Sequence, residues 1–199
     1  MRACLLALLL LLPLTAHAAP ETNKQAPEFA VTAIDGVKVD LVAYRGKIVV
    51  LEWNNPGCPF VHKHYDSGNM QKLQAYAQQK SVVWLTINSG AAGKQGSMDA
   101  AQAKAYVAIN KATPTHYILD PRGTIGHLYD AKTTPHMFVI DSLGNIAYKG
   151  AIDDQPTPDP TSLVKAHNYV RLAIDSLLDG KPVLMASTQS YGCSVKYGN

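Results

Sequence analysis

Hydrophobic residues along the chain fall into patterns that predict strands, with helices between them. Apolar and polar residues alternate through 29–41 on either side of Asp35-Gly36, which is typical of a tight β-hairpin. The runs 48–51 and 82–87 are almost continuously apolar and rich in β-branched residues. Such runs predict central strands that are covered on both faces.

Three more strands are expected in the second half of the chain. The segment 117–119 is apolar and ends at a turn that begins with Pro121. The segments 136–140 and 146–152 are separated by 141–145, whose Asp, Ser, Gly and Asn residues favour a tight turn. We therefore expect these last two strands to be antiparallel neighbours.

A helix is expected to begin beside Cys58. Pro59 is suited to the first helical position, because its missing N–H has no intrahelical partner there. The sequence Asp-Ser-Gly-Asn at 66–69 predicts a break, after which the helix should resume as far as Gln79.

Three other helices are predicted. An alanine-rich helix should run over 97–110 with Ser97 as its cap, and a short helix should cover 125–129. Apolar residues recur at helical spacing from Leu163 to Leu177, which predicts a final helix that ends at Gly180.

The order of these elements predicts an α/β fold with a mixed central sheet, helices on its faces and an N-terminal β-hairpin. Residues 19–180 are expected to form one domain, without internal repeats. Residues 181–199 show little periodicity and form a C-terminal tail that carries Cys193.

The first 18 residues have the features of a cleavable signal peptide. Arg2 precedes a leucine-rich run from Leu5 to Leu12, and small residues follow at Ala16 and Ala18. The apolar run is too short to span a bilayer core about 30 Å thick. We therefore expect a periplasmic or secreted protein without a membrane anchor.

Charge and motifs exclude several other functions. The net charge of +3 is small, and no cluster of Lys and Arg marks a surface for nucleic acid. The loop 90–97 lacks the glycine and lysine spacing of a nucleotide-binding loop.

Two of the three cysteines remain once the signal peptide is removed, because Cys4 lies within it. Cys58 and Cys193 would then share a compartment in which disulfides form and persist.

Two segments point to a known family. The first is the strand that ends at Trp53 and leads into Gly57-Cys58-Pro59-Phe60-Val61, and the second is Thr133-Thr134-Pro135 before the strand 137–141. The chain resembles the peroxiredoxin-like redoxins of the thioredoxin superfamily, a group that includes alkyl hydroperoxide reductase and thiol-specific antioxidant proteins. The resemblance implies a thioredoxin-like fold and a thiol-dependent antioxidant oxidoreductase that needs no cofactor.

Cys58 is the candidate nucleophile on physical grounds as well. A thiol at a helix N-terminus faces unpaired N–H groups and the positive end of the helix dipole, which lower its pKa. Lys63, His62 and His64 lie one to two turns further along and could add positive potential, and His62 is the best placed of them. A solvated position is the alternative for each histidine.

The residues around Cys58 differ from the motifs of both thioredoxin-like reductases and peroxiredoxins. Val61 and Asn55 stand three residues after and before Cys58, so there is no Cys-x-x-Cys dithiol. Asn55 also occupies the position of the threonine that peroxiredoxins carry. The resemblance therefore leaves open whether the substrate is a small hydroperoxide or a protein disulfide.

Pro135 resembles the cis proline that lies against the active cysteine in this superfamily, with Thr134 before it. Cys193 is the remaining thiol and has two alternatives. It can resolve an oxidised Cys58, or it can form a permanent bridge worth about 4 to 5 kcal/mol in the chain-entropy model.

Glu52 lies at the end of the strand before Cys58, next to Trp53, where a carboxyl group with a raised pKa could shuttle protons; a solvated carboxylate is the alternative.

The leading hypothesis is thus an exported oxidoreductase in which Cys58 attacks and Cys193 resolves, served by a thiol reductant system. A different hypothesis is a copper or zinc delivery protein that uses Cys58, His62, His136 and Cys193, because thiolate and imidazole suit those metals. A third is a redox-inert module that binds peptides near Pro135. The sequence gives no indication of the oligomeric state.

Overall fold

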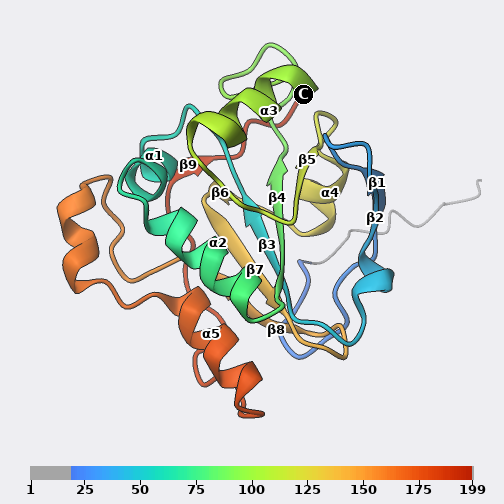
Figure 1. Cartoon of the computed structure of the whole chain (residues 1–199), viewed down its shortest axis with the longest axis vertical. Helices are drawn as coiled ribbons and strands as arrows, with labels where there is room; N and C mark the ends of the chain where they lie inside the picture. The colour runs from blue at the N-terminus through green and yellow to red at the C-terminus, as the bar shows by residue number, and fades with distance from the viewer. Residues whose placement is uncertain (1–18, 199) are drawn as a thin grey trace, which may run out of the picture.

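The computed structural model describes residues 19–198 (Figure 1). The predicted signal peptide lies outside this range. A mixed five-stranded sheet in the order β5-β4-β3-β7-β8 forms the centre of the molecule. Its strands are β3 Val49–Trp53, β4 Val83–Asn88, β5 His116–Leu119, β7 His136–Ile140 and β8 Ile146–Gly150. The central strand β3 pairs in parallel with β4 and antiparallel with β7, so the predicted α/β fold is confirmed.

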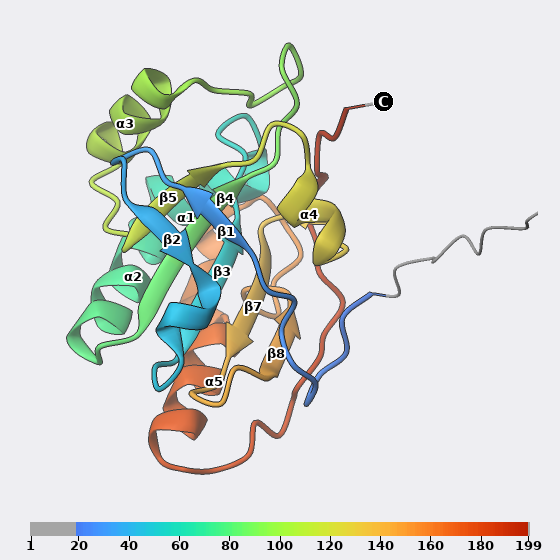
Figure 2. The same ribbon diagram turned by 90° about the vertical axis from the view of Figure 1, so that its right-hand side faces the viewer.

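One face of the sheet is covered by three helices, α1 Pro59–Asp66, α2 Asn69–Gln79 and α5 Tyr169–Leu178. The other face is covered by α4 Thr124–Leu128 and by the hairpin of β1 Ala30–Thr32 and β2 Lys38–Asp40, which is followed by the short helix η1 Leu41–Tyr44. Figure 2 shows this hairpin in front of the sheet. The alternation of residues along β3 explains the two cores, since Leu51 and Trp53 face the hairpin side and Val50 faces the helices.

Two predicted helix starts are wrong. The alanine-rich helix α3 Ala100–Ile109 begins after Asp99 rather than at Ser97, because Asp99 and Gln102 form a capping box in which each side chain binds the other's backbone N–H. The final helix α5 does not begin near Leu163, since Pro160–Lys165 form the separate 3-10 helix η2. Asn168 then caps α5 by accepting a hydrogen bond from the N–H of Arg171.

The C-terminal tail is more regular than its sequence suggests. Cys193–Ser194 form the strand β9, which pairs antiparallel with β6 Thr133–Thr134. Beyond it, Val195 donates a backbone hydrogen bond of 3.0 Å to the carbonyl of Lys132. In Figure 1 the red tail passes α1 and β6 before it ends near α3.

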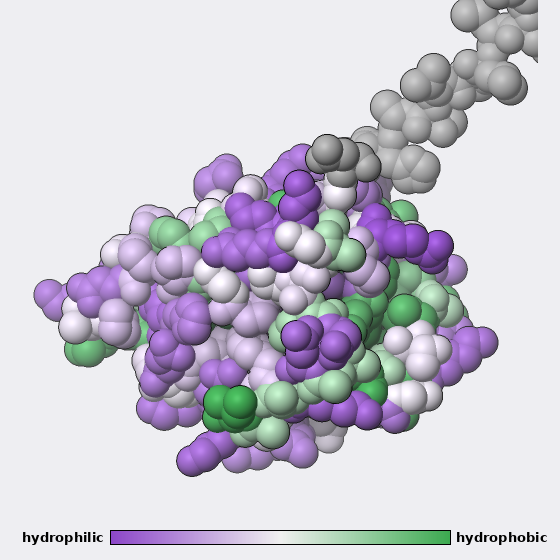
Figure 3. Space-filling view, turned by 90° about the horizontal axis from the view of Figure 1, so that it is seen from above, coloured by the Kyte–Doolittle hydropathy of each residue, from purple (hydrophilic) through white to green (hydrophobic). Residues whose placement is uncertain are grey.

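The end of the molecule that carries α3 and the C-terminus has hydrophilic and hydrophobic residues interspersed over its surface (Figure 3). None of the helices in residues 19–198 is long and apolar enough to cross a membrane.

Candidate active site

Cys58 is the N-cap of α1 and is completely buried. Its carbonyl accepts hydrogen bonds of 2.9 Å from the N–H groups of Val61 and His62, which makes it the first acceptor of the helix. Pro59 occupies the first turn, as its sequence position predicts. The thiol therefore lies where the backbone N–H groups of a helix are unpaired.

The thiol lies against the segment that contains Pro135. Its Sγ donates a 3.0 Å hydrogen bond to the carbonyl oxygen of Thr134. The peptide bond between Thr134 and Pro135 is cis, so the cis geometry implied by the resemblance is confirmed. Cys58 and Pro135 are brought together although 76 residues separate the cysteine from Thr134.

Cys193 lies beside the same carbonyl group. It is the direct partner of Thr134 in the pairing of β6 with β9, and its thiol is close enough to lower the pKa of Cys58. Both cysteines are free thiols in the structure. Residues far apart in sequence thus form a dithiol without a Cys-x-x-Cys motif.

The two thiols have opposite pKa shifts. Burial alone would raise the pKa of Cys58, but interactions with Cys193, with the side chain of Thr134 and with the N–H of Val61 outweigh it and lower that pKa. Burial, followed by the contact with Cys58, raises the pKa of Cys193 to about 11. Cys58 is therefore the thiol that ionises first, with Cys193 as a protonated donor beside it.

Gly192 allows this close approach. Its φ is +124°, and a Cβ at this position would lie 2.1 Å from the carbonyl oxygen of Thr134. Only a residue without a side chain fits the tail against Thr134 in this conformation.

The side chains of Asn55 and Trp53 form hydrogen bonds with groups other than the Cys58 sulfur. The Asn55 side chain accepts a 2.8 Å hydrogen bond from the N–H of Gly57 and so fixes the turn before Cys58. Trp53 is buried on the opposite face of the sheet, where its indole N–H donates to Ser89 at 3.1 Å.

Glu52 is completely buried rather than solvated. Its carboxyl group accepts hydrogen bonds from Tyr65 at 2.7 Å, Trp84 at 2.8 Å and Thr86 at 2.9 Å, with Asn54 and Gln74 further away at 3.3 Å. Burial raises its pKa although these hydrogen bonds oppose the shift. The raised pKa agrees with our expectation. These five partners, however, join Glu52 to its neighbours in the core and not to Cys58. Its use as a proton shuttle stays a prediction.

The expectation that His62 acts on Cys58 is not supported. Its side chain is 53% exposed and pairs with Asp66 at 3.2 Å, one turn along the helix and away from the thiol. A helix exposes its residues at regular intervals, and His62 falls on the solvent side of α1.

The donor set of the copper or zinc hypothesis is not assembled. His136 lies on the hairpin side of the sheet, packed against Phe138, whereas Cys58 lies on the helix side. Burial lowers the pKa of His136 to about 4, and its Nδ1 accepts a hydrogen bond from the N–H of Lys132. Within residues 19–198 no cluster of three or more His, Cys, Asp or Glu is arranged to hold a metal ion.

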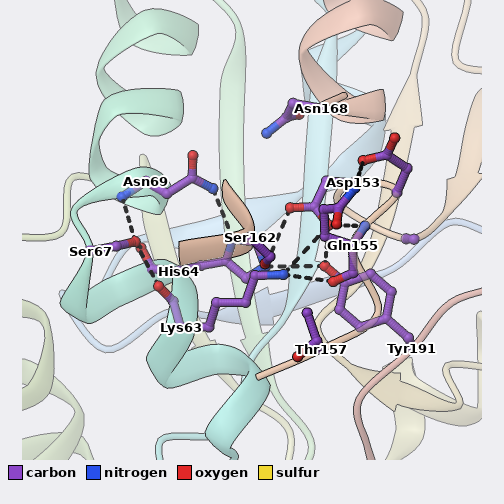
Figure 4. A network of polar contacts seen from close by, with 12 residues as sticks. Lys63, His64, Ser67, Asn69, Asp153, Gln155, Thr157, Ser162, Asn168 and Tyr191 are labelled. Atoms are coloured by element: carbon purple, nitrogen blue, oxygen red, sulfur yellow. Dashed lines mark hydrogen bonds and ion pairs between the residues drawn. The ribbon is translucent and has the colours of Figure 1, made fainter. Parts of the chain in front are cut away.

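A buried polar cluster beside the thiols was missed by sequence reasoning. It joins Lys63 and His64 of α1 to Asp153, which follows β8, and to Tyr191 of the tail (Figure 4). The alternative of a solvated position is wrong for His64. No local signal in the sequence marks this cluster, because its members come from three distant segments.

Comparisons with known proteins agree with this geometry. The sequence model of the AhpC/TSA family matches residues 22–149. No match was found among curated protein sequences.

Solved structures show the same fold. An uncharacterised conserved protein from Geobacillus kaustophilus is 27% identical with a TM-score of 0.76, over 89% of this chain and 93% of that one. A hypothetical protein from Sinorhizobium meliloti is 22% identical with a TM-score of 0.77, over 91% and 97%. A putative thiol:disulfide interchange protein DsbE from Chlorobium tepidum is 24% identical with a TM-score of 0.55, over 66% and 85%. With the family model covering more than half of its length, the chain belongs to the AhpC/TSA family of redoxins.

Proposed function

We propose that this redoxin is an exported thiol oxidoreductase that exchanges disulfides, with Cys58 as the nucleophile and Cys193 as the resolving thiol. The observation that carries the proposal is that both cysteines meet at Thr134: Cys58 donates to its carbonyl, and Cys193 is its partner in the pairing of β6 with β9. A dithiol with one lowered and one raised pKa has the division of roles that disulfide exchange requires.

The reaction would proceed in two exchanges. The Cys58 thiolate attacks one sulfur of a substrate disulfide, forms a mixed disulfide and releases the other substrate sulfur as a thiolate. Cys193 then loses its proton and attacks Cys58, which forms the Cys58–Cys193 bridge and releases the second substrate thiolate. The substrate gains two electrons from the protein, and an external thiol reductant must restore both cysteines.

Disulfide substrates fit the site better than hydroperoxides. The resemblance to peroxiredoxins implies an arginine that binds the peroxide, but the three arginines in the described part of the chain have other places: Arg45 binds the carbonyl of Leu143, Arg171 pairs with Asp175, and Arg122 is exposed in the turn after β5. Asn55 is used to shape the turn before Cys58. Hydroperoxide reduction remains the second candidate because the AhpC/TSA model matches the chain.

Export to an oxidising compartment is part of the same proposal. The predicted signal peptide would deliver the dithiol to a compartment where disulfide substrates are present.

The test is to add one equivalent of glutathione disulfide, or of hydrogen peroxide, to the reduced mature protein and to analyse the products by mass. The wild-type protein should form the Cys58–Cys193 bridge faster with the disulfide. Cys193→Ser should stop at a glutathione adduct on Cys58, and Cys58→Ser should form neither product.

Two results would contradict the proposal. An adduct on Cys193 with Cys58 unmodified would reverse the roles. A bridge that forms readily with peroxide but not with the disulfide would favour the second candidate. Peptide mapping after alkylation of the remaining thiols distinguishes the two cysteines.

A further inference from the structure

Tyr191 joins the tail to the helix that carries Cys58. It lies two residues before Cys193, whereas Lys63 and His64 lie on α1 one to two turns after Cys58. Its hydroxyl donates a hydrogen bond to Asp153 and accepts one from His64. Its ring packs against Phe60 with a centroid separation of 5.8 Å.

The donors and acceptors in this cluster fit together in one arrangement. Burial, and then the charge of Lys63, lower the pKa of His64 to about 3, so its ring is neutral. The amide nitrogen of Asn69 donates to its Nδ1 at 2.8 Å, so the proton of the neutral ring is on Nε2. This N–H points to the Tyr191 oxygen at 3.3 Å, and the Tyr191 hydroxyl then donates to Asp153.

Lys63 supplies the counter-charge of the cluster. The side chains of Lys63 and Asp153 are both fully buried, with 3.8 Å between the ammonium and the carboxylate. Lys63 also donates a 2.7 Å hydrogen bond to the carbonyl of Gln155, and its ammonium lies 5.4 Å from the centre of the Tyr191 ring. Buried charges of this kind are stable only when paired, so the cluster holds a defined geometry.

The other oxygen of the Asp153 carboxylate, Oδ2, is buried without a hydrogen bond. Three groups contact Oδ1 instead: the hydroxyl of Tyr191, the ammonium of Lys63 and the backbone N–H of Gln155. Removal of the Tyr191 hydroxyl would leave the carboxylate and the His64 N–H short of partners, which is costly in a buried site.

We propose that Tyr191 is a positioning residue that sets how closely the tail presents Cys193 to Cys58, through its hydroxyl contacts with His64 and Asp153. This proposal rests on the proposed function of the dithiol. Gly192, between Tyr191 and Cys193, lies against the Thr134 carbonyl. A shift of Tyr191 therefore moves Cys193 with it.

The test compares Tyr191→Phe with Tyr76→Phe. Tyr76 is a matched control, since its hydroxyl also donates to an aspartate, Asp175, but this bond joins α2 to α5 and not the tail to α1. For each variant the equilibrium between the Cys58–Cys193 bridge and glutathione is measured, which gives the effective concentration of Cys193 at Cys58. We expect a fall of about tenfold for Tyr191→Phe and no change for Tyr76→Phe.

A second readout separates positioning from general destabilisation. The pH dependence of Cys58 alkylation should shift to higher pH in Tyr191→Phe, because a displaced Cys193 no longer donates to the thiolate. In a Cys193→Ala background the same substitution should cause no further shift.

An unchanged bridge equilibrium and an unchanged alkylation profile in Tyr191→Phe would overturn the proposal, as would an equal effect of Tyr76→Phe. If the wild-type protein forms no bridge, the proposed function fails by itself. The alkylation profile then still decides whether Tyr191 positions Cys193.

Discussion

Replacement of Gly192 by alanine should separate the two thiols without touching either of them. An alanine at a φ of +124° occupies a conformation that costs residues with a side chain about 1 to 3 kcal/mol. Its Cβ would also lie 2.1 Å from the carbonyl oxygen of Thr134. The reduced protein can relieve both strains by lifting the tail, but the bridged protein cannot, because Cys193 is then tied to Cys58.

The strain should therefore weaken the bridge relative to the dithiol. Since about 1.4 kcal/mol corresponds to tenfold, 1 to 3 kcal/mol predicts a fall of about 5- to 150-fold in the equilibrium constant for bridge formation against glutathione. The measurement is to equilibrate the protein in glutathione buffers of defined ratio, quench with acid and separate the two forms by chromatography.

Gly180→Ala is the matched control. Gly180 also has a positive φ of +67°, but nothing lies within 4 Å of the Cβ that alanine would add. This variant carries a backbone penalty far from Thr134 and the two cysteines in sequence and without a clash, so its bridge equilibrium should equal that of the wild type. Equal equilibrium constants for Gly192→Ala and the wild type would refute the role of the Thr134 contact.

The remaining predictions concern single titrating groups. His62→Ala should leave the pH midpoint of Cys58 alkylation unchanged, because this histidine pairs with Asp66 in solvent; a shift would restore its catalytic role. Cys193→Ala should raise the same midpoint by removing a hydrogen bond to the thiolate; a lower midpoint would contradict the geometry. The pKa of Glu52 is raised in the folded protein. Its contribution to stability is therefore fully present below about pH 4.5, the ordinary pKa of a glutamate, and is lost as the pH rises toward its pKa in the folded protein. Glu52→Gln should therefore flatten the decline in melting temperature above pH 4.5, and parallel curves for the two proteins would show that Glu52 does not titrate there.

Much of the fold could be predicted because its signals are local. The continuous apolar run before Cys58 gives β3, and the proline after it gives the start of α1. The start of α3 is also marked locally, by the capping pair Asp99 and Gln102, although Ser97 is an equally common cap residue and is the start predicted from the sequence. The final helix was predicted too long because helical spacing continues back to Leu163, where proline-rich sequence in fact forms a separate 3-10 helix.

The candidate site was predictable only in part. Cys58 and Pro135 are recognisable from adjacent residues, and the resemblance to redoxins links them. The polar cluster has no such signal, because a lysine is expected to be exposed to solvent unless an oppositely charged partner offsets the cost of its burial. The partner of Lys63 is Asp153, which lies about 90 residues later, and only the folded chain brings the two together.

The strand β9 has a consequence for any protein substrate. It pairs with the edge of Thr133–Thr134, so an extended peptide that added its own backbone hydrogen bonds there, beside Cys58, would have to displace it. The tail is thus a tethered competitor whose local concentration stays the same however dilute the protein becomes. A peptide that needs this edge binds only the fraction of molecules whose tail has lifted, and its apparent affinity falls by that fraction. A small disulfide that reaches Cys58 without pairing to Thr134 does not compete with the tail. The tail would therefore discriminate between substrates by whether they pair their backbone with Thr133–Thr134, and not by the chemistry of their disulfide.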